Sequence, residues 1–212
     1  MGRTELLVGI LADAVQGIVE WLPVSSQGNL ALFLTAAGTD PDVALQLALF
    51  LQLGTTLSAA TYYREDIARA LQRVPGWRPG KAYDEENALI SYLLVACAMT
   101  ALVGIPLYVF AIDLAGELGG AVFAGMIGAL LVLTGLARLT AEFTRAGDRQ
   151  QPTLVDSVLV GAVQGVAILP GVSRSGVTSS ALLVRRYQPT DAFRLSFGLA
   201  LLGGLAVAVL PA

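Results

Sequence analysis

The sequence contains no histidine and a single cysteine among its 212 residues. The absence of His excludes an imidazole as general base, nucleophile or metal ligand, and together with the lone Cys it argues against a structural zinc site. Cys97 has no partner for an intramolecular disulfide, so we interpret it as a small packing residue.

Charged residues are also scarce. They make up 14% of the chain, against about 25% in ordinary soluble domains, whereas 55% of the residues are hydrophobic. The net charge of −3 provides no basic face for nucleic acid. Three runs contain no charged residue and are each long enough to cross a bilayer: 43–63, 87–112 and 118–137. This composition indicates a multi-pass membrane protein.

Three further apolar segments are less regular: 4–33, 153–184 and 190–212. The first is interrupted by Pro23 and the polar run that follows it, and the second by Pro170 and the run up to Gly176. Each of these two therefore predicts a helix, a break and a second helix. Non-helical backbone at membrane depth is tolerated only where protein or a water-filled cavity satisfies its polar groups. We therefore expect the two breaks to shelter each other.

The two breaks resemble copies of one motif. An offset of 148 residues aligns 14–28 (AVQGIVEWLPVSSQG) with 162–176 (AVQGVAILPGVSRSG), and seven of the fifteen positions are identical. We interpret this as an internal duplication, with repeat 1 at about 4–111 and repeat 2 at about 118–212.

The basic residues indicate how the repeats are oriented, because cytoplasmic loops are enriched in Lys and Arg. Segments 64–86, 138–152 and 185–194 carry the basic residues and are assigned to the inside, whereas 34–42 and 113–117 carry only acidic ones and are assigned to the outside. Three crossings separate the broken segments, so the second copy is inverted. The predicted fold is an all-α membrane protein with at least four transmembrane helices and two re-entrant helix-break-helix hairpins that form an inverted-topology repeat.

Arg174 is the strongest functional signal. A guanidinium inside a broken intramembrane segment is costly, and its fork geometry suits phosphate or carboxylate. Neighbouring hydroxyls and a helix that restarts just after them predict an anion-binding helix N-terminus. The residues expected to bind substrate here are Gly171, Ser173, Ser175 and Gly176. The alternative is a purely structural ion pair between Arg174 and Glu20.

Glu20 lies at the end of the first half-helix. Its carboxylate is a candidate ligand for Mg²⁺ or Ca²⁺, both of which commonly bridge to phosphate oxygens. It is also a candidate general base, or simply a helix-end carboxylate at an aqueous interface.

The first break supplies further polar groups. Ser25 and Ser26 are candidate phosphate donors, with Ser26 the candidate nucleophile, although serine at such a turn is more often a helix cap. Gln16 and Gln164 occupy equivalent positions in the two copies and are candidates to bond each other's loops and the substrate.

At these residues the sequence resembles the undecaprenyl-diphosphatase, or bacitracin-resistance, family. Residues 20–29 (EWLPVSSQGN) are similar to that family's E-[FW]-L-P-[IV]-S-S-T-G-H, and 170–176 (PGVSRSG) match its P-G-x-S-R-S-G. The order, the spacing and the duplication agree as well, so the resemblance covers essentially the whole chain.

The resemblance implies six transmembrane helices with two re-entrant hairpins, in the cell membrane, with an active site that faces the outer leaflet. It implies hydrolysis of undecaprenyl diphosphate with a divalent cation, in lipid carrier recycling for cell wall biogenesis and in antibiotic resistance. Glu20 would then serve metal binding or catalysis, Ser26 would be nucleophile or phosphate ligand, and Ser173 and Arg174 would hold the diphosphate. Gln27, Gly28 and Asn29 of the same motif are expected to line the substrate site. Membrane lipids are the expected surroundings, and a second copy in a homodimer is a candidate partner.

The sequence departs from the family pattern at three positions. Gln16 stands where a second Glu is common, Asn29 where a His is common, and Gln27 where Thr is usual. The first two replacements remove candidate acid/base or metal-binding groups, so binding of a lipid phosphate is a firmer expectation than its hydrolysis. The chain also ends at Ala212, about where one or two family helices would follow, which suggests a short variant or a truncated form.

Three functions remain open at this stage: a phosphatase of polyprenyl diphosphates, a carrier or flippase that moves a lipid-linked phosphate without hydrolysis, and a noncatalytic membrane scaffold. Inverted repeats with broken helices also build alternating-access proteins, which is the basis of the second.

Overall fold

The computed structural model describes residues 25–143 and 147–207, and six residues before them: Leu7, Ile10, Leu11, Ala14, Gln16 and Gly17. The described residues form helices and no named strand, as the sequence predicts. In chain order the helices are α2 (Ser26–Ala36), α3 (Pro41–Tyr62), α4 (Arg64–Arg73), α5 (Ala88–Glu117), α6 (Gly120–Glu142), α7 (Leu154–Val166), α8 (Arg174–Val184) and α9 (Pro189–Val207). Two short 3-10 turns, Val74–Gly76 and Pro79–Lys81, lie between α4 and α5.

Three of these helices, α3, α5 and α6, are long and apolar enough to cross a membrane. They correspond to the three charge-free runs, and α9 corresponds to the predicted segment 190–212 up to residue 207. Many large apolar side chains of these helices point away from the protein core, including Leu133 and Leu102, each more than 60% exposed. Exposed apolar surface of this extent suits a lipid environment. The protein is therefore an all-helical, multi-pass membrane protein.

The helices differ from the sequence prediction at two connections. Helix α4 lies within 64–86, which the sequence assigns to an inside loop. Asp113 was placed in an outer loop, but α5 continues through it to Glu117, and only residues 118 and 119 separate α5 from α6. A carboxylate near the end of a membrane helix can reach the aqueous interface. The helix can therefore continue past Asp113.

Helices α2 and α8 begin and end at an offset of 148 residues, and α3 and α9 begin at the same offset. Helices α2 and α8 are each 11 residues long, starting at Ser26 and Arg174, and α3 and α9 both start at a proline. The intervening turns also match, because Thr39 N–H donates to the Leu34 carbonyl in one and Tyr187 N–H to the Leu182 carbonyl in the other. The duplicated pattern thus extends from the motif into the helix that follows it.

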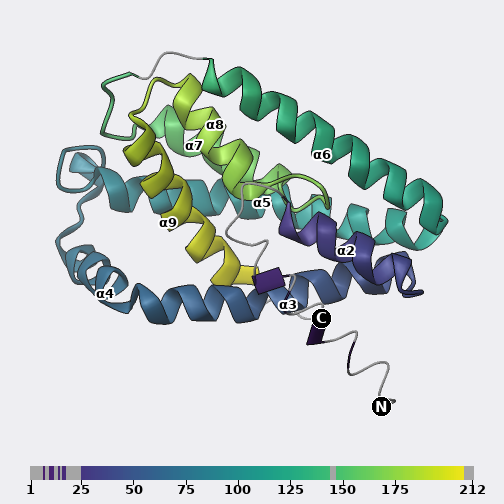
Figure 1. Ribbon diagram of the computed structural model, residues 1–212. Helices are drawn as coiled ribbons and strands as arrows, with labels where there is room; N and C mark the ends of the chain where they lie inside the picture. The colour runs from purple at the N-terminus through teal and green to yellow at the C-terminus, as the bar shows by residue number, and fades with distance from the viewer. Residues whose placement is uncertain are drawn as a thin grey trace.

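Helices α2 and α8 run from the middle of the molecule to opposite ends. Figure 1 shows the α2–α3 and α5–α6 connections at one end and α4 with the α8–α9 turn at the other, and the starts of α2 and α8 lie between these ends. The first end carries the acidic connections and the second the basic ones. We call them the acidic end and the basic end.

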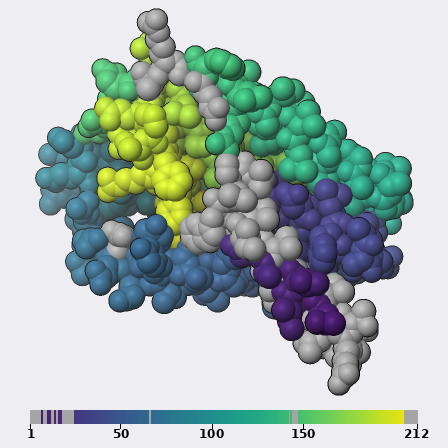
Figure 2. Space-filling model, viewed as in Figure 1, coloured from purple at the N-terminus to yellow at the C-terminus, as the bar shows by residue number. Residues whose placement is uncertain are grey.

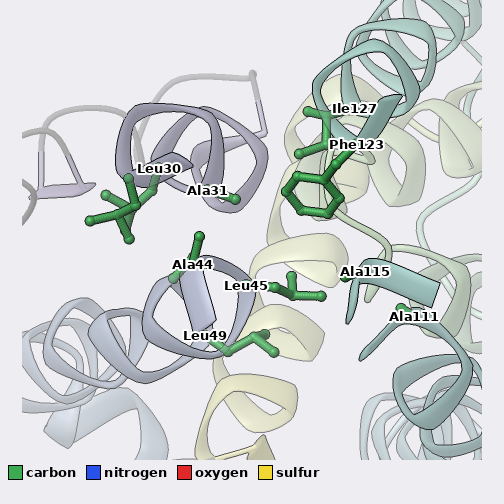
Figure 3. Packing of buried hydrophobic residues seen from close by; sticks show 11 residues of the cluster. Leu30, Ala31, Ala44, Leu45, Leu49, Ala111, Ala115, Phe123 and Ile127 are labelled. Carbon is green, nitrogen blue, oxygen red and sulfur yellow. The ribbon is translucent and has the colours of Figure 1, made fainter. Parts of the chain in front are cut away.

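Two apolar clusters hold these elements together. Leu30 of α2, Leu45 of α3 and Phe123 of α6 belong to the first (Figure 3), and Tyr92 of α5 with Leu182 of α8 to the second. Helix α7 lies against α5 through Gly161 and Gly165. A Cβ on Gly161 would lie 2.4 Å from the Ala96 carbonyl oxygen, so only glycine permits this approach.

Candidate active site

The starts of α2 and α8 face one cavity of about 400 Å³. Its polar lining comes from both predicted breaks, with Ser25, Ser26 and Gln27 from the first and Ser173, Arg174 and Ser175 from the second. Its other walls come from α3, α6 and α9, and Figure 2 shows a hollow between α9 and the corner formed by α3 and α4. The two segments that the sequence predicts to shelter each other therefore line the same space.

The start of α2 and the residues just before and at the start of α8, here called the two tips, are in direct contact beside this cavity. The Gln27 side-chain amide donates a hydrogen bond to the Ile168 carbonyl at 3.3 Å. A Cβ on Gly28 would lie 2.6 Å from the backbone nitrogen of Gly171, and Gly171 itself has a φ of +97°. The tips approach closely because both positions are glycine, and at Gly171 the backbone also lies in the left-handed region.

Each tip is an N-capped helix start with the same geometry. The Ser25 hydroxyl accepts from Gly28 N–H and the Ser173 hydroxyl accepts from Gly176 N–H, both at 3.2 Å. Each serine hydroxyl keeps its own proton for another acceptor. A helix N-terminus carries roughly half a positive charge, so two of them directed at one cavity favour an anion.

Ser26 and Arg174 occupy equivalent positions, since each is the first residue of its helix. Arg174 lines the main cavity and also a second one of about 140 Å³, which lies between α5, α7 and α9. A guanidinium placed between two cavities can change its rotamer without leaving the site. Together, Ser26 and Arg174 bring a hydroxyl and a cation to the cavity at the tips.

Asn29, Gln164 and Gln16 are not among the residues that line the main cavity. The Asn29 side chain donates to the Ser25 carbonyl at 2.8 Å and so supports the first cap. Gln164 is buried, and its amide donates to the Leu199 carbonyl of α9 at 3.3 Å, while it lines the smaller cavity beside Arg174. Gln16 is buried as well. Direct substrate contact by these residues, and by Gly28, Gly171 and Gly176, stays a prediction.

Glu20, the predicted metal ligand and catalytic carboxylate, lies outside the described residues. The described lining of the main cavity offers hydroxyl and amide oxygens and two guanidinium groups but no carboxylate. Within residues 25–143 and 147–207 no group of three His, Cys, Asp or Glu side chains could hold a metal ion.

Sequence reasoning missed one cation of this cavity. Arg138 of α6 is among the lining residues, whereas the sequence assigns it to an inside loop with other basic residues. The available signal was its position directly after the charge-free run 118–137.

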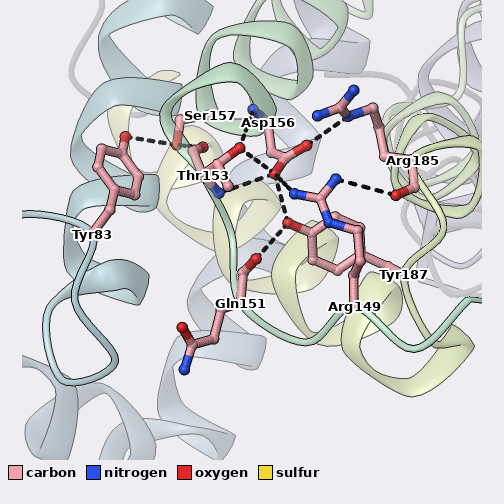
Figure 4. Close-up of polar contacts among 8 residues, drawn as sticks. All are labelled: Tyr83, Arg149, Gln151, Thr153, Asp156, Ser157, Arg185 and Tyr187. Carbon is pink, nitrogen blue, oxygen red and sulfur yellow. Dashed lines mark hydrogen bonds and ion pairs between the residues drawn. The ribbon is translucent and has the colours of Figure 1, made fainter.

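Sequence reasoning also missed a buried carboxylate that holds the second hairpin together at the basic end (Figure 4). Asp156 of α7 is fully buried and forms ion pairs with Arg149 at 3.0 Å and with Arg185 at 2.7 Å. The Thr153 hydroxyl and the Tyr187 hydroxyl donate to it at 2.6 and 2.7 Å. This cluster joins the start of α7 to the end of α8, and hence fixes the two legs of the hairpin that carries Arg174.

The cluster also sets the protonation of its members. Burial alone would raise the pKa of Asp156, but the hydrogen bonds from Thr153, Arg185 and Tyr187 outweigh it and hold that pKa below the ordinary range. Burial and the hydrogen bond to Asp156 raise the pKa of Tyr187. Asp156 therefore stays ionised and Tyr187 stays protonated at neutral pH.

Comparison with known proteins agrees with these features. The sequence model of the bacitracin resistance protein BacA family matches residues 9–211. An undecaprenyl-diphosphatase of Haloarcula marismortui is 43% identical over 208 residues, which are 97% of this chain and 76% of that relative. The undecaprenyl-diphosphatase of Methanococcoides burtonii is 40% identical over 190 residues, which cover 89% of this chain and 71% of that relative. That of Saccharolobus solfataricus is 37% identical over 215 residues, covering 97% and 74%. With two serine-capped helix starts at one cavity and a match across nearly its whole length, this chain belongs to the bacitracin resistance protein BacA family.

Proposed function

We propose that this protein hydrolyses a polyprenyl diphosphate of the undecaprenyl type to the monophosphate and inorganic phosphate, and so recycles the lipid carrier. The observation that carries the proposal is the shared cavity, in which two helix N-termini and Arg174 surround one space. The names of the relatives, all undecaprenyl-diphosphatases, supply the substrate class.

The chemistry requires charge neutralisation and alignment more than covalent work by the protein. Arg174 and the N–H groups of the two tips neutralise the terminal phosphate. An oxygen nucleophile, water or the Ser26 hydroxyl, forms a bond to the terminal phosphorus while the bond to the bridging oxygen breaks. The prenyl monophosphate leaves with that oxygen, and where Ser26 attacks, water then releases inorganic phosphate from the serine.

Glu20 and a divalent cation, Mg²⁺ or Ca²⁺, belong to this proposal as predicted from the sequence. The cation would supply charge neutralisation of the diphosphate. Chelation by EDTA should abolish phosphate release, and re-addition of the metal should restore it.

We also propose that the protein lies in the cell membrane and that the reaction takes place on the outer leaflet. Its proposed roles are in cell wall biogenesis and bacitracin resistance. Polyprenyl diphosphate and the surrounding lipids are the expected partners.

A carrier that moves the lipid phosphate without hydrolysis is the second candidate, and one observation favours it. The cavity-lining residues of α3 and α6, such as Thr55, Ala59 and Arg138, come from the halves of those helices nearer the basic end. A cavity displaced toward one end is expected of a site that alternates between two faces.

Phosphate release from a purified polyprenyl diphosphate separates the two candidates. Wild type should release phosphate, and Arg174→Ala and Glu20→Gln should each reduce the rate about 100-fold or more. Arg194→Ala is the matched control because Arg194 is exposed on α9 and does not line the cavity. Binding of the lipid by wild type without any release would reject the phosphatase and favour the carrier.

A further inference from the structure

Arg138 lies on the face of α6 that packs against the rest of the protein. Ile127, Leu131 and Thr134 form the inner stripe of α6, and Arg138 continues it at the next helical turn. Its neighbours Leu136 and Leu139 are 53% and 52% exposed, whereas Arg138 is half-buried and lines the main cavity. Its position is that of a cavity residue and not of a loop charge.

Contacts of Thr134 locate Arg138 relative to the second hairpin. The Thr134 hydroxyl donates to the Gly171 carbonyl at 3.4 Å, and a Cβ on Gly176 would lie 3.5 Å from the Thr134 methyl group. Helices α6 and α8 both run toward the basic end (Figure 1). Arg138 is therefore one turn, about 6 Å, farther from the tips than Thr134. Its Cα–Cβ bond tilts toward the N-terminus of α6 and hence toward the tips, and Arg138 lines the cavity that the tips face.

The lining of the cavity changes from polar to apolar from the tips toward the basic end. Ser175, Ser179 and Leu183 line it at successive turns of α8, polar near the tip and apolar near the basic end. Phe193 and Phe197 of α9, stacked at 6.0 Å between ring centroids, line its wall as well. A ligand with a polar head at the tips and an apolar chain beside Leu183 would place its middle at Arg138.

The charge of the described lining is also suited to more than one phosphate. It contains the guanidinium groups of Arg138 and Arg174 and no carboxylate. Two cations spaced along the cavity match two phosphates in line, because each guanidinium can bind one phosphate through paired N–H groups.

We propose that Arg138 binds the phosphate that carries the prenyl chain, while Arg174 and the helix N-termini bind the terminal phosphate. This inference rests on the proposed lipid-diphosphate site and assigns its two phosphates to different residues. The position at Arg138 also binds the single phosphate of the prenyl monophosphate product, whereas inorganic phosphate binds at Arg174.

Binding measured without hydrolysis tests this assignment. Dissociation constants for a polyprenyl monophosphate and for inorganic phosphate are determined in detergent for wild type, Arg138→Gln, Arg174→Gln and the exposed control Arg194→Gln. Arg138→Gln should weaken the lipid monophosphate 10-fold or more and change inorganic phosphate less than 3-fold, and Arg174→Gln should show the reverse order of losses. Arg194→Gln should change neither.

Equal losses for both ligands in Arg138→Gln, or no loss of lipid monophosphate, would overturn the assignment. Arg138→Lys guards against misfolding of the glutamine variant, since it keeps the charge but loses the paired donors. It should weaken the lipid monophosphate about 3-fold or more with inorganic phosphate unchanged, and equal affinities in Arg138→Lys and wild type would count against the proposal. A wild type that binds in this pattern without releasing phosphate would reject the proposed hydrolysis and leave this assignment standing.

Discussion

Asp156 is the residue on which the base of the second hairpin depends. Asp156→Asn would leave Arg149 and Arg185 facing each other without the carboxylate that neutralises them. Breaking a buried ion pair on one side costs about 3–5 kcal/mol, and we expect the lower part of that range because both arginines are about one-third exposed. Thermal unfolding in detergent measures the loss, and Asp148→Asn, a change at a nearby exposed carboxylate, is the control.

The same residue predicts a pH dependence. The pKa of Asp156 is lower in the folded protein than the ordinary value of about 3.9. The ionised carboxylate therefore adds its full contribution to folding stability above that value, and this contribution is lost as the pH falls through the lowered pKa. Wild type should therefore lose melting temperature below about pH 4, and Asp156→Asn should lose less over that window. Parallel pH profiles for the two proteins would contradict this role.

At this scale the motif residues were predictable and their neighbours were not. The repeated pattern marks four residues in the chain, and all four line the cavity: Ser25, Ser26, Ser173 and Arg174. Arg138 escaped prediction because a basic residue that follows an apolar run is ordinarily a loop charge. Asp156 escaped because its ion pairs come from residues 149 and 185, and only folding brings these together.

Helices α2 and α8 must approach start to start, and Gly28 decides whether they can. Gly28→Ala would place a methyl group 2.6 Å from the Gly171 nitrogen, in backbone that cannot rotate away. We expect the tips to separate and the free energy of unfolding to fall by about 1–3 kcal/mol because of overpacking. Phosphate release should also fall strongly.

Gly125→Ala provides the comparison for this change. Gly125 lies inside α6, and a Cβ there would meet nothing within 4 Å. Alanine stabilises an exposed helix interior by up to about 1 kcal/mol relative to glycine, so this variant should keep both its melting temperature and its activity. Equal behaviour of the two variants would show that the tips are not in close contact.

The elements themselves were predicted better than their ends. The three charge-free runs became α3, α5 and α6, and the two breaks became the starts of α2 and α8. The amphipathic helix α4 and the extension of α5 to Glu117 were missed, because a chain at a membrane interface can remain helical among charged residues.

For the whole molecule, the distribution of charge predicts which end faces the cell interior. In a Cys97→Ser background, Asp40→Cys places a thiol in the exposed α2–α3 turn and Gly80→Cys places one between α4 and α5 at the basic end. A membrane-impermeant maleimide added to intact cells should label the first, and the second only after permeabilisation. Labelling of Gly80→Cys in intact cells would reverse the orientation.

The central claim is that the starts of α2 and α8, two helices that run to opposite ends of the molecule, form one site for a lipid diphosphate. An experimental structure with a non-hydrolysable methylene diphosphonate analogue of the prenyl lipid tests it most directly. The account predicts the terminal phosphonate between the starts of α2 and α8, within hydrogen-bonding distance of the Arg174 guanidinium. A headgroup bound elsewhere, or held by only one of the two tips, would contradict it.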